Sequence, residues 1–188
     1  MDFSVASSLR TLSAAPLKGF TNEILDNLLG DCEQALAAGL TTFGVVRGGV
    51  MEWRGHIATS FYKKNATWMK DKDIPSEVAG INRTKSVTVG ETRVGDRFSQ
   101  WQKPGGQQGS YYADQGVGPE GLGILPTGKV RTDYVSIAPS PSLRSTAADV
   151  RVTWEGGPPG GTPASGGEMQ TFATNRTAFS AQPPLVSP

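Results

Sequence analysis

Apolar positions follow a helical period in one early segment of the chain. The residues that share one face at this spacing are Ile24, Leu25, Leu28, Leu29, Cys32, Ala35 and Leu36. Thr21 can cap the first turn, and Gly39 can supply the left-handed residue that ends a helix. The pattern predicts an N-terminal amphipathic helix from Asn22 to about Ala38 that buries this face.

A period of two, which is typical of strands, recurs in short segments further along. Residues 130–138 and 149–154 alternate between apolar and polar side chains. Residues 86–90 and 92–95 predict two more short strands around Gly90 and Glu91. The fold class that fits best is α+β or mainly β, with the N-terminal helix packed on a small antiparallel sheet.

Residues 40–61 allow two interpretations. Over residues 40–53, β-branched and aromatic residues on both sides of Gly48 and Gly49 are typical of a β-hairpin. The alternative is a second helix with one face formed by Val50, Trp53, Ile57 and Phe61. Because Gly55 weakens a helix at this place, we favour the hairpin.

Glycine and proline divide the chain into regions. There are 24 glycines and 13 prolines in 188 residues, whereas an average protein has roughly 7% and 5%. Most of them follow Lys103, while apolar residues concentrate before Gly95. We predict an N-terminal arm over residues 1–19, a folded core over 20–154 and a Gly/Pro-rich extended C-terminal arm over 155–188.

An arm of this composition buries too little apolar surface to order itself, because fixing each backbone residue costs about 1–2 kcal/mol. We therefore expect the arm to dock on neighbouring subunits. The predicted interface residues are Met169, Phe172, Phe179, Leu185 and Val186 on the arm, with Trp53 and Trp68 on the core.

Charge and cysteine content narrow the functional classes. The net charge is +1, so no global field favours nucleic acid or a membrane, although Lys and Arg outnumber Asp and Glu over residues 41–103. The single cysteine, Cys32, excludes an intrachain disulfide and fits a reducing compartment. No apolar run is long enough to span a bilayer, and residues 1–15 lack the features of a signal peptide.

Two glycine motifs resemble nucleotide-binding loops. Gly116, Gly118 and Gly121 match G-x-G-x-x-G, but the flanking residues predict neither the strand nor the helix that this motif requires. The segment from Gly123 to Val130 resembles a P-loop but has valine in place of the Mg²⁺-binding hydroxyl. We predict no bound cofactor.

Other catalytic or metal-binding patterns are weak. The only histidine, His56, has no cluster of ligands near it in sequence, so no metal site is predicted. Carboxylates that a hydrolase could pair are Glu52, Glu91, Asp96, Glu120 and Asp133, but the sequence alone does not pair them. We predict no catalytic residues.

Arms at both ends, a small core and no catalytic pattern are typical of subunits of large particles. We therefore predict a non-enzymatic structural subunit of a virus or phage particle (a capsid, decoration or tail protein), assembled in the cytoplasm. Its partners would be copies of itself or other structural subunits. One alternative is a nucleic-acid- or glycan-binding module that uses Trp53, Trp68, Trp101, Tyr111 and Tyr112. A second alternative is a small hydrolase that uses His56.

Overall fold

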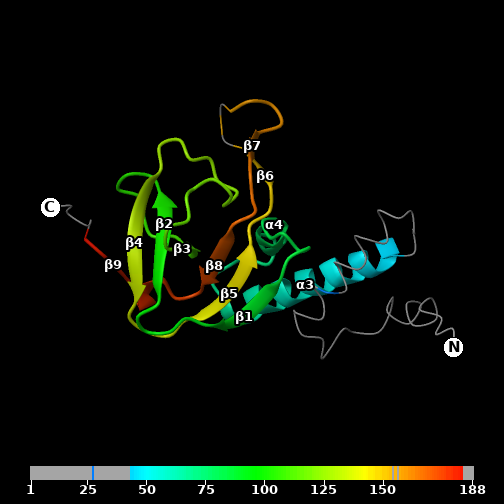
Figure 1. The fold of residues 1–188 in the computed structure, drawn as a ribbon, viewed down its shortest axis with the longest axis horizontal. Coiled ribbons are helices and arrows are strands. Elements are labelled where there is room, and N and C mark those ends of the chain that lie inside the picture. Colours follow the sequence, from blue (N-terminus) through cyan, green and yellow to red (C-terminus); the bar gives the residue numbers. More distant parts are fainter. Residues whose placement is uncertain (1–26, 28–42, 154, 156, 184–188) are drawn as a thin grey trace.

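The computed structural model describes residues 27, 43–153, 155 and 157–183. A seven-stranded antiparallel sheet dominates it, with the order β1-β5-β8-β3-β2-β4-β9 (Figure 1). Its strands are β1 (Val87–Glu91), β2 (Arg97–Gln102), β3 (Tyr111–Asp114), β4 (Val130–Ser136), β5 (Pro141–Thr146), β8 (Met169–Ala173) and β9 (Phe179–Ala181). A separate ribbon pairs β6 (Val150–Val152) with β7 (Thr162–Ala164).

The helical elements are α3 (Phe43–Asn65), α4 (Ile74–Ala79) and the short 3-10 helix η1 (Arg176–Ala178). Figure 1 shows α3 running behind β1 and β5 and extending past the edge of the sheet. None of the helices in the described ranges is both long and apolar enough to cross a membrane.

One hydrophobic core lies between α3 and the β1–β5–β8 half of the sheet. Phe61 and Tyr62 of α3 pack there against Leu143 of β5 and Phe172 of β8. The rings of Tyr62 and Phe172 meet edge to face, with centroids 5.0 Å apart, which is a favoured aromatic geometry. This contact fixes α3 on the sheet.

A second core lies on the β3–β2–β4–β9 half. Phe98, Tyr112, Tyr134 and Phe179 form its aromatic centre. Tyr112 and Phe179 stack with their ring centroids 4.4 Å apart. The two cores meet at the neighbouring strands β8 and β3, and the site described below lies beside this junction.

The favoured hairpin over residues 40–53 is wrong, because residues 43–53 belong to helix α3. Val50 and Phe61 are buried on the helix as the alternative interpretation expected, and burying this face offsets the weakness of the glycines. Gly55 has no side chain, and this leaves room for Arg83. A Cβ at position 55 would lie 3.2 Å from the guanidinium of Arg83.

Other parts of the sequence prediction have mixed outcomes. The fold is mainly β with one main helix, as the coarse fold class stated. The strands predicted at 86–90, 130–138 and 149–154 correspond to β1, β4 and β6, whereas residues 92–95 form a turn. The helix predicted over 22–38, apart from Asn27, and the arm predicted over 1–19 lie outside the described residues.

The C-terminal segment differs most from its prediction as an extended arm. Its residues form β7, β8 and β9, and β8 lies inside the sheet between β5 and β3. Phe172 pairs with Leu143 on one side and Tyr111 on the other. Hydrogen bonds to β5 and β3 therefore order β8, although its own composition predicted no ordered structure.

Candidate functional site

A cavity opens where β2 and β3 separate. These strands pair only at Phe98–Asp114 and Ser99–Ala113. Beyond this point the Gln100 side chain occupies the gap. Its amide oxygen accepts a hydrogen bond from the Gly109 nitrogen at 2.9 Å, and its amide nitrogen donates to the Tyr111 carbonyl at 2.7 Å. These two bonds hold the separated strands at a fixed spacing.

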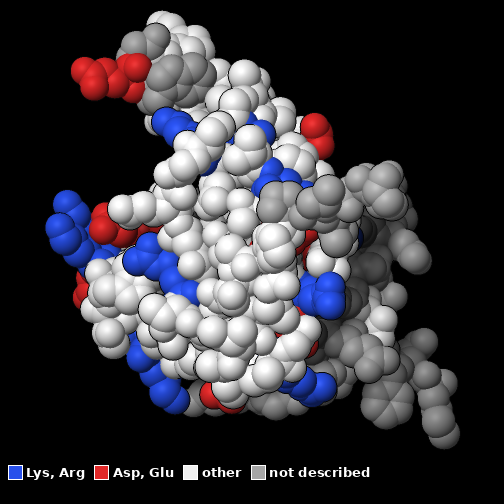
Figure 2. Space-filling model, turned by 90° about the vertical axis from the view of Figure 1, so that its left-hand side faces the viewer, with Lys and Arg blue, Asp and Glu red and all other residues white. Residues whose placement is uncertain are grey.

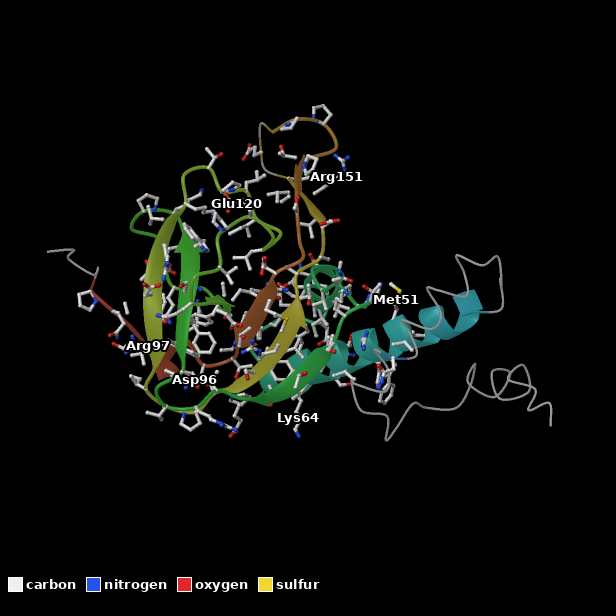
Figure 3. All side chains as sticks on the ribbon, viewed as in Figure 1. Met51, Lys64, Asp96, Arg97, Glu120 and Arg151 are labelled. Carbon is white, nitrogen blue, oxygen red and sulfur yellow. The ribbon has the colours of Figure 1, made fainter. Side chains whose placement is uncertain are left out.

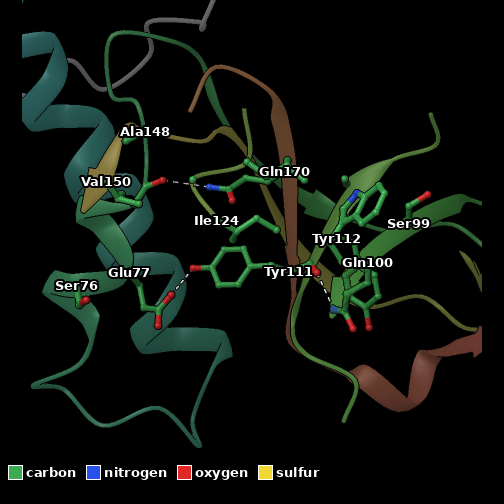
Figure 4. Close-up of a pocket in the computed structure, with 15 residues that line it drawn as sticks. Ser76, Glu77, Ser99, Gln100, Tyr111, Tyr112, Ile124, Ala148, Val150 and Gln170 are labelled. Carbon is green, nitrogen blue, oxygen red and sulfur yellow. Dashed lines mark hydrogen bonds between the residues drawn. The ribbon is translucent and has the colours of Figure 1, made fainter. Parts of the chain in front are cut away.

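The cavity has a volume of about 250 Å³ and is lined by α4, β2, β3, β8, β6 and the glycine-rich loop of residues 115–129, which connects β3 to β4 (Figure 4). Its aromatic residues are Trp101, Tyr111 and Tyr112, although the ring of Tyr112 packs into the second core on Phe179. Its aliphatic walls include Leu122, Ile124 and Val150. Its polar side chains are Ser76, Glu77, Ser99, Gln100 and Gln170. A mostly apolar hollow with a few polar groups is the usual form of a small-molecule site.

Glu77 on α4 is oriented by a chain of two tyrosines. The Tyr111 hydroxyl donates a hydrogen bond to the Glu77 carboxylate, as Figure 4 shows. The Tyr62 hydroxyl lies 3.1 Å from that of Tyr111. Since Tyr111 uses its proton on Glu77, Tyr62 must be the donor to Tyr111. Burial is the main cause that raises the pKa of both tyrosines well above the usual value, so both keep their protons.

Burial also raises the pKa of Tyr112, to about 12. A tyrosine with a raised pKa stays protonated in the folded chain but ionises in the unfolded chain near pH 10. The stability that it contributes is therefore present below about pH 10 and is lost between about pH 10 and 12.

We expect the free energy of unfolding to fall as pH rises above 10, and to fall less steeply in a Tyr112→Phe variant. The difference in slope should approach 1.4 kcal/mol per pH unit, the effect of about one proton. Urea unfolding at several pH values from 9 to about 12 measures both slopes. Identical slopes would show that Tyr112 titrates normally in the folded chain.

The glycine-rich loop forms one wall of the cavity. Gly121 and Gly123 have φ angles of +88° and +68°, which favour glycine. The Glu168 nitrogen donates to the Gly121 carbonyl at 2.9 Å, and the Gly123 nitrogen donates to that of Ser165 at 2.8 Å. The glycines of the motif that resembled a dinucleotide-binding loop thus allow the loop to pack closely on residues 165–168, just before β8. The segment that resembled a P-loop leads into strand β4.

Ser99 is fixed by an ion pair behind it. Its hydroxyl donates to Asp133 at 2.8 Å, and Arg131 pairs with the same carboxylate at 2.7 Å. Partial burial acts to raise the pKa of Asp133, but the hydrogen bonds from Arg131 and Ser99 outweigh it and leave the pKa below its usual value. Asp133 is therefore ionised and occupied with a structural role.

The structure brings together only some of the residues considered for binding or catalysis. Trp101, Tyr111 and Tyr112 meet at the cavity. Trp53 lies on α3, where its ring stacks at 5.8 Å on the exposed His56, and neither residue lines the cavity. Within the described ranges, no three His, Cys, Asp or Glu side chains gather closely enough to hold a metal ion.

The predicted interface residues lie in different surroundings. Phe172 and Phe179 are buried in the two cores. Met169 is half-buried on β8, and Trp68 is 54% exposed, with its ring stacked on Phe172. Leu185 and Val186 fall outside the described residues. An interface role for these residues stays a prediction.

The excess of lysine and arginine over residues 41–103 does not form a continuous basic patch on the face that Figure 2 shows. There, lysine and arginine side chains are scattered among acidic and uncharged ones. The candidate carboxylates are also dispersed, since Figure 3 places Asp96 and Glu120 at opposite ends of the sheet in this view. None of the carboxylates considered from the sequence lines the cavity.

Sequence reasoning missed Glu77, Gln100 and Gln170. They lie on α4, β2 and β8 and come together only through the sheet order. Two signals pointed towards the site. Pro75 is typical of a helix start and places Glu77 in the first turn of α4. The adjacent Tyr111 and Tyr112, between two glycine-rich segments, suggested a binding surface.

Comparison with known proteins identifies the class. The family model described as bacterial toxin 46 matches residues 49–179. The NAD(P)(+) glycohydrolase toxin Tse6 of Pseudomonas aeruginosa is 31% identical over 150 residues, which cover 71% of this chain and 33% of Tse6. The chain thus spans about a third of the length of this relative. A solved structure of Tse6 in complex with Tsi6 superposes with a TM-score of 0.59 and 27% identity, covering 71% of this chain and 97% of the solved one.

These matches overturn the prediction of a non-enzymatic virion subunit, because the matched relatives are toxins and one of them is named as an enzyme. The predicted partners and the virion location are wrong for the same reason. The solved relative is bound to Tsi6 and not to structural subunits of a particle. The family model covers more than half of the chain, including every residue that lines the cavity. The chain belongs to the bacterial toxin 46 family.

Proposed function

We propose that this chain is a toxin domain that hydrolyses NAD(P)⁺ between nicotinamide and ribose. The observation that carries the proposal is the Glu77 carboxylate, which buried tyrosines orient at an aromatic-lined cavity. The similarity to a toxin named as an NAD(P)⁺ glycohydrolase supplies the substrate class.

Cleavage of the bond between ribose and nicotinamide is favoured by one fixed negative charge near the ribose. As the bond between ribose C1′ and nicotinamide N1 breaks, its electron pair moves to N1 and neutralises the ring, while positive charge develops on the ribose. Glycoside hydrolysis passes through a similar oxocarbenium-like transition state. A preorganised carboxylate that lies beside such a developing charge stabilises it.

Water completes the reaction at C1′. Its oxygen forms the new bond to C1′ and its proton passes to a base, for which Glu77 is the candidate. The products are nicotinamide, ADP-ribose or its 2′-phosphate, and one proton. A carboxylate that already accepts a hydrogen bond from Tyr111 keeps its second oxygen available for water or the ribose.

Gln170 is the candidate for orienting the ribose. Its side chain reaches from β8 towards α4, where its amide nitrogen donates to the Gly80 carbonyl at 3.2 Å (Figure 4). An amide offers both donors and an acceptor to sugar hydroxyls. Because Gln170 is 9% exposed and tied to α4, its position changes little when a ligand enters.

The test is release of nicotinamide from NAD⁺ and NADP⁺ by the whole chain, made by cell-free synthesis and followed by chromatography. Ala148→Phe places a ring in the cavity and should abolish release. Ala79→Phe is the matched control, because Ala79 lies on the same short helix as Glu77 but outside this cavity. Absence of release by the wild-type chain would refute the proposal, and so would full activity of a folded Ala148→Phe variant.

A further inference from the structure

We propose that a second cavity, between α3 and α4, binds a small phosphate monoester. This cavity has a volume of about 370 Å³, which falls within the roughly 300–1,000 Å³ of small-molecule sites. None of its lining residues belongs to the cavity that contains Glu77. The second site is therefore independent of the proposed hydrolysis.

Helix α4 separates the two cavities. Ser76 and Glu77 face the first cavity (Figure 4). Ile74, Pro75 and Val78 line the second. At about 3.6 residues per turn, these two sets of residues fall on opposite sides of a helix. A ligand in the second cavity thus contacts a face of α4 that the hydrolysis does not use.

Two cations line the second cavity. Lys63 of α3 is exposed, and Arg83, which follows α4, is half-buried. In the part of the chain that the structure describes, neither side chain has a hydrogen bond or an ion pair. A half-buried cation without a partner is unfavourable. A phosphate between Lys63 and Arg83 would supply this partner through charged hydrogen bonds.

A glycine of α3 allows Arg83 to reach this position. Gly55, Thr59 and Lys63 follow one another at intervals of four residues and so share one face of the helix. A Cβ at position 55 would lie 3.2 Å from the guanidinium of Arg83 and 3.8 Å from Val78. Glycine weakens the interior of a helix, but here it lets the arginine side chain lie against α3 on the same face as Lys63.

The charges of the lining indicate the class of ligand. Asp71 is the only acidic residue of this cavity, and it is exposed, so two cations and one carboxylate leave an excess of one positive charge. A phosphate monoester carries up to about two negative charges near neutral pH, and the arginine fork can bind two of its oxygens. The apolar side chains of α4 suit a small apolar group on the ester.

Phenyl phosphate is a suitable probe, because its ring matches the apolar wall. Calorimetric titration of the whole wild-type chain should give a Kd below about 1 mM, and neutral phenol should bind at least about tenfold more weakly. Lys63→Gln removes an exposed cation and should weaken phenyl phosphate binding by at least about tenfold. The matched control is Lys64→Gln, because Lys64 is the next residue of α3 but lines neither cavity. This variant should bind like the wild type.

Equal affinities of the Lys63→Gln and Lys64→Gln variants would overturn the proposal. A wild-type chain that binds phenol as tightly as phenyl phosphate, or that binds neither, would also overturn it, and these results need no variant to fold.

Two variants that fill one cavity each separate this site from the hydrolysis. Ala148→Phe should lose nicotinamide release and keep phenyl phosphate binding, because Ala148 lines only the first cavity. Ala79→Phe should keep release and lose binding, because Ala79 lines only the second. Release by the wild-type chain without phenyl phosphate binding refutes only the second site, whereas binding without release refutes only the hydrolysis.

Discussion

Replacing Glu77 by glutamine is expected to lower kcat for NAD(P)⁺ hydrolysis by about 10²–10³-fold, the usual effect of removing one preorganised electrostatic group. Glutamine has nearly the same size and can still accept the hydrogen bond from Tyr111. The fold should therefore persist while the negative charge beside the developing cation is lost. Initial rates of nicotinamide release over a range of NAD⁺ concentrations give kcat and KM.

The control for this prediction is Glu91→Gln, which removes a carboxylate from an exposed part of β1 and should leave kcat unchanged. Circular dichroism establishes that both variants are folded. A folded Glu77→Gln variant as fast as the wild-type chain would exclude Glu77 from the chemistry. Gln170 and Gln100 would then be the next residues of the cavity to replace.

Phe172→Ala should reduce the free energy of unfolding by about 3–5 kcal/mol, the usual cost of truncating a buried phenylalanine. Phe172 is 1% exposed. Its ring lies 5.0 Å from the rings of both Tyr62 and Tyr111, measured between centroids. Removing it leaves a hollow beneath the two tyrosines that orient Glu77, so activity should fall as well. Urea unfolding of the wild type and the variant measures the loss.

Ile137→Ala is the matched surface control. Ile137 is 55% exposed, and its truncation should change stability by no more than about 0.5 kcal/mol. A Phe172→Ala variant as stable as Ile137→Ala would mean that β8 is not part of the sheet. That result would restore the extended arm that glycine and proline content suggested for this segment.

The sequence by itself determined the elements whose pattern is local. Alternation of apolar and polar residues predicted β4 and β6 close to where they lie, because a strand whose two faces have different surroundings shows its period directly. The alternative of a binding module named five aromatic residues, of which Trp101, Tyr111 and Tyr112 line the cavity and Trp53 and Trp68 do not. Composition, in contrast, led to the wrong functional class, because a small toxin domain with many loops resembles a structural subunit in its glycine and proline content.

Only the tertiary structure decided between helix and hairpin at α3, and between arm and strand at β8. Val50 fits either pattern, and the helix buries both Val50 and Phe61, of which Phe61 packs against the sheet. Phe172 and its neighbours become a strand because β5 and β3 offer hydrogen-bonding edges on both sides. The cavity depends on tertiary structure too, since Glu77, Gln100 and Gln170 are distant in sequence and meet only through the strand order. Long-range pairing sets these positions, and no local pattern encodes it.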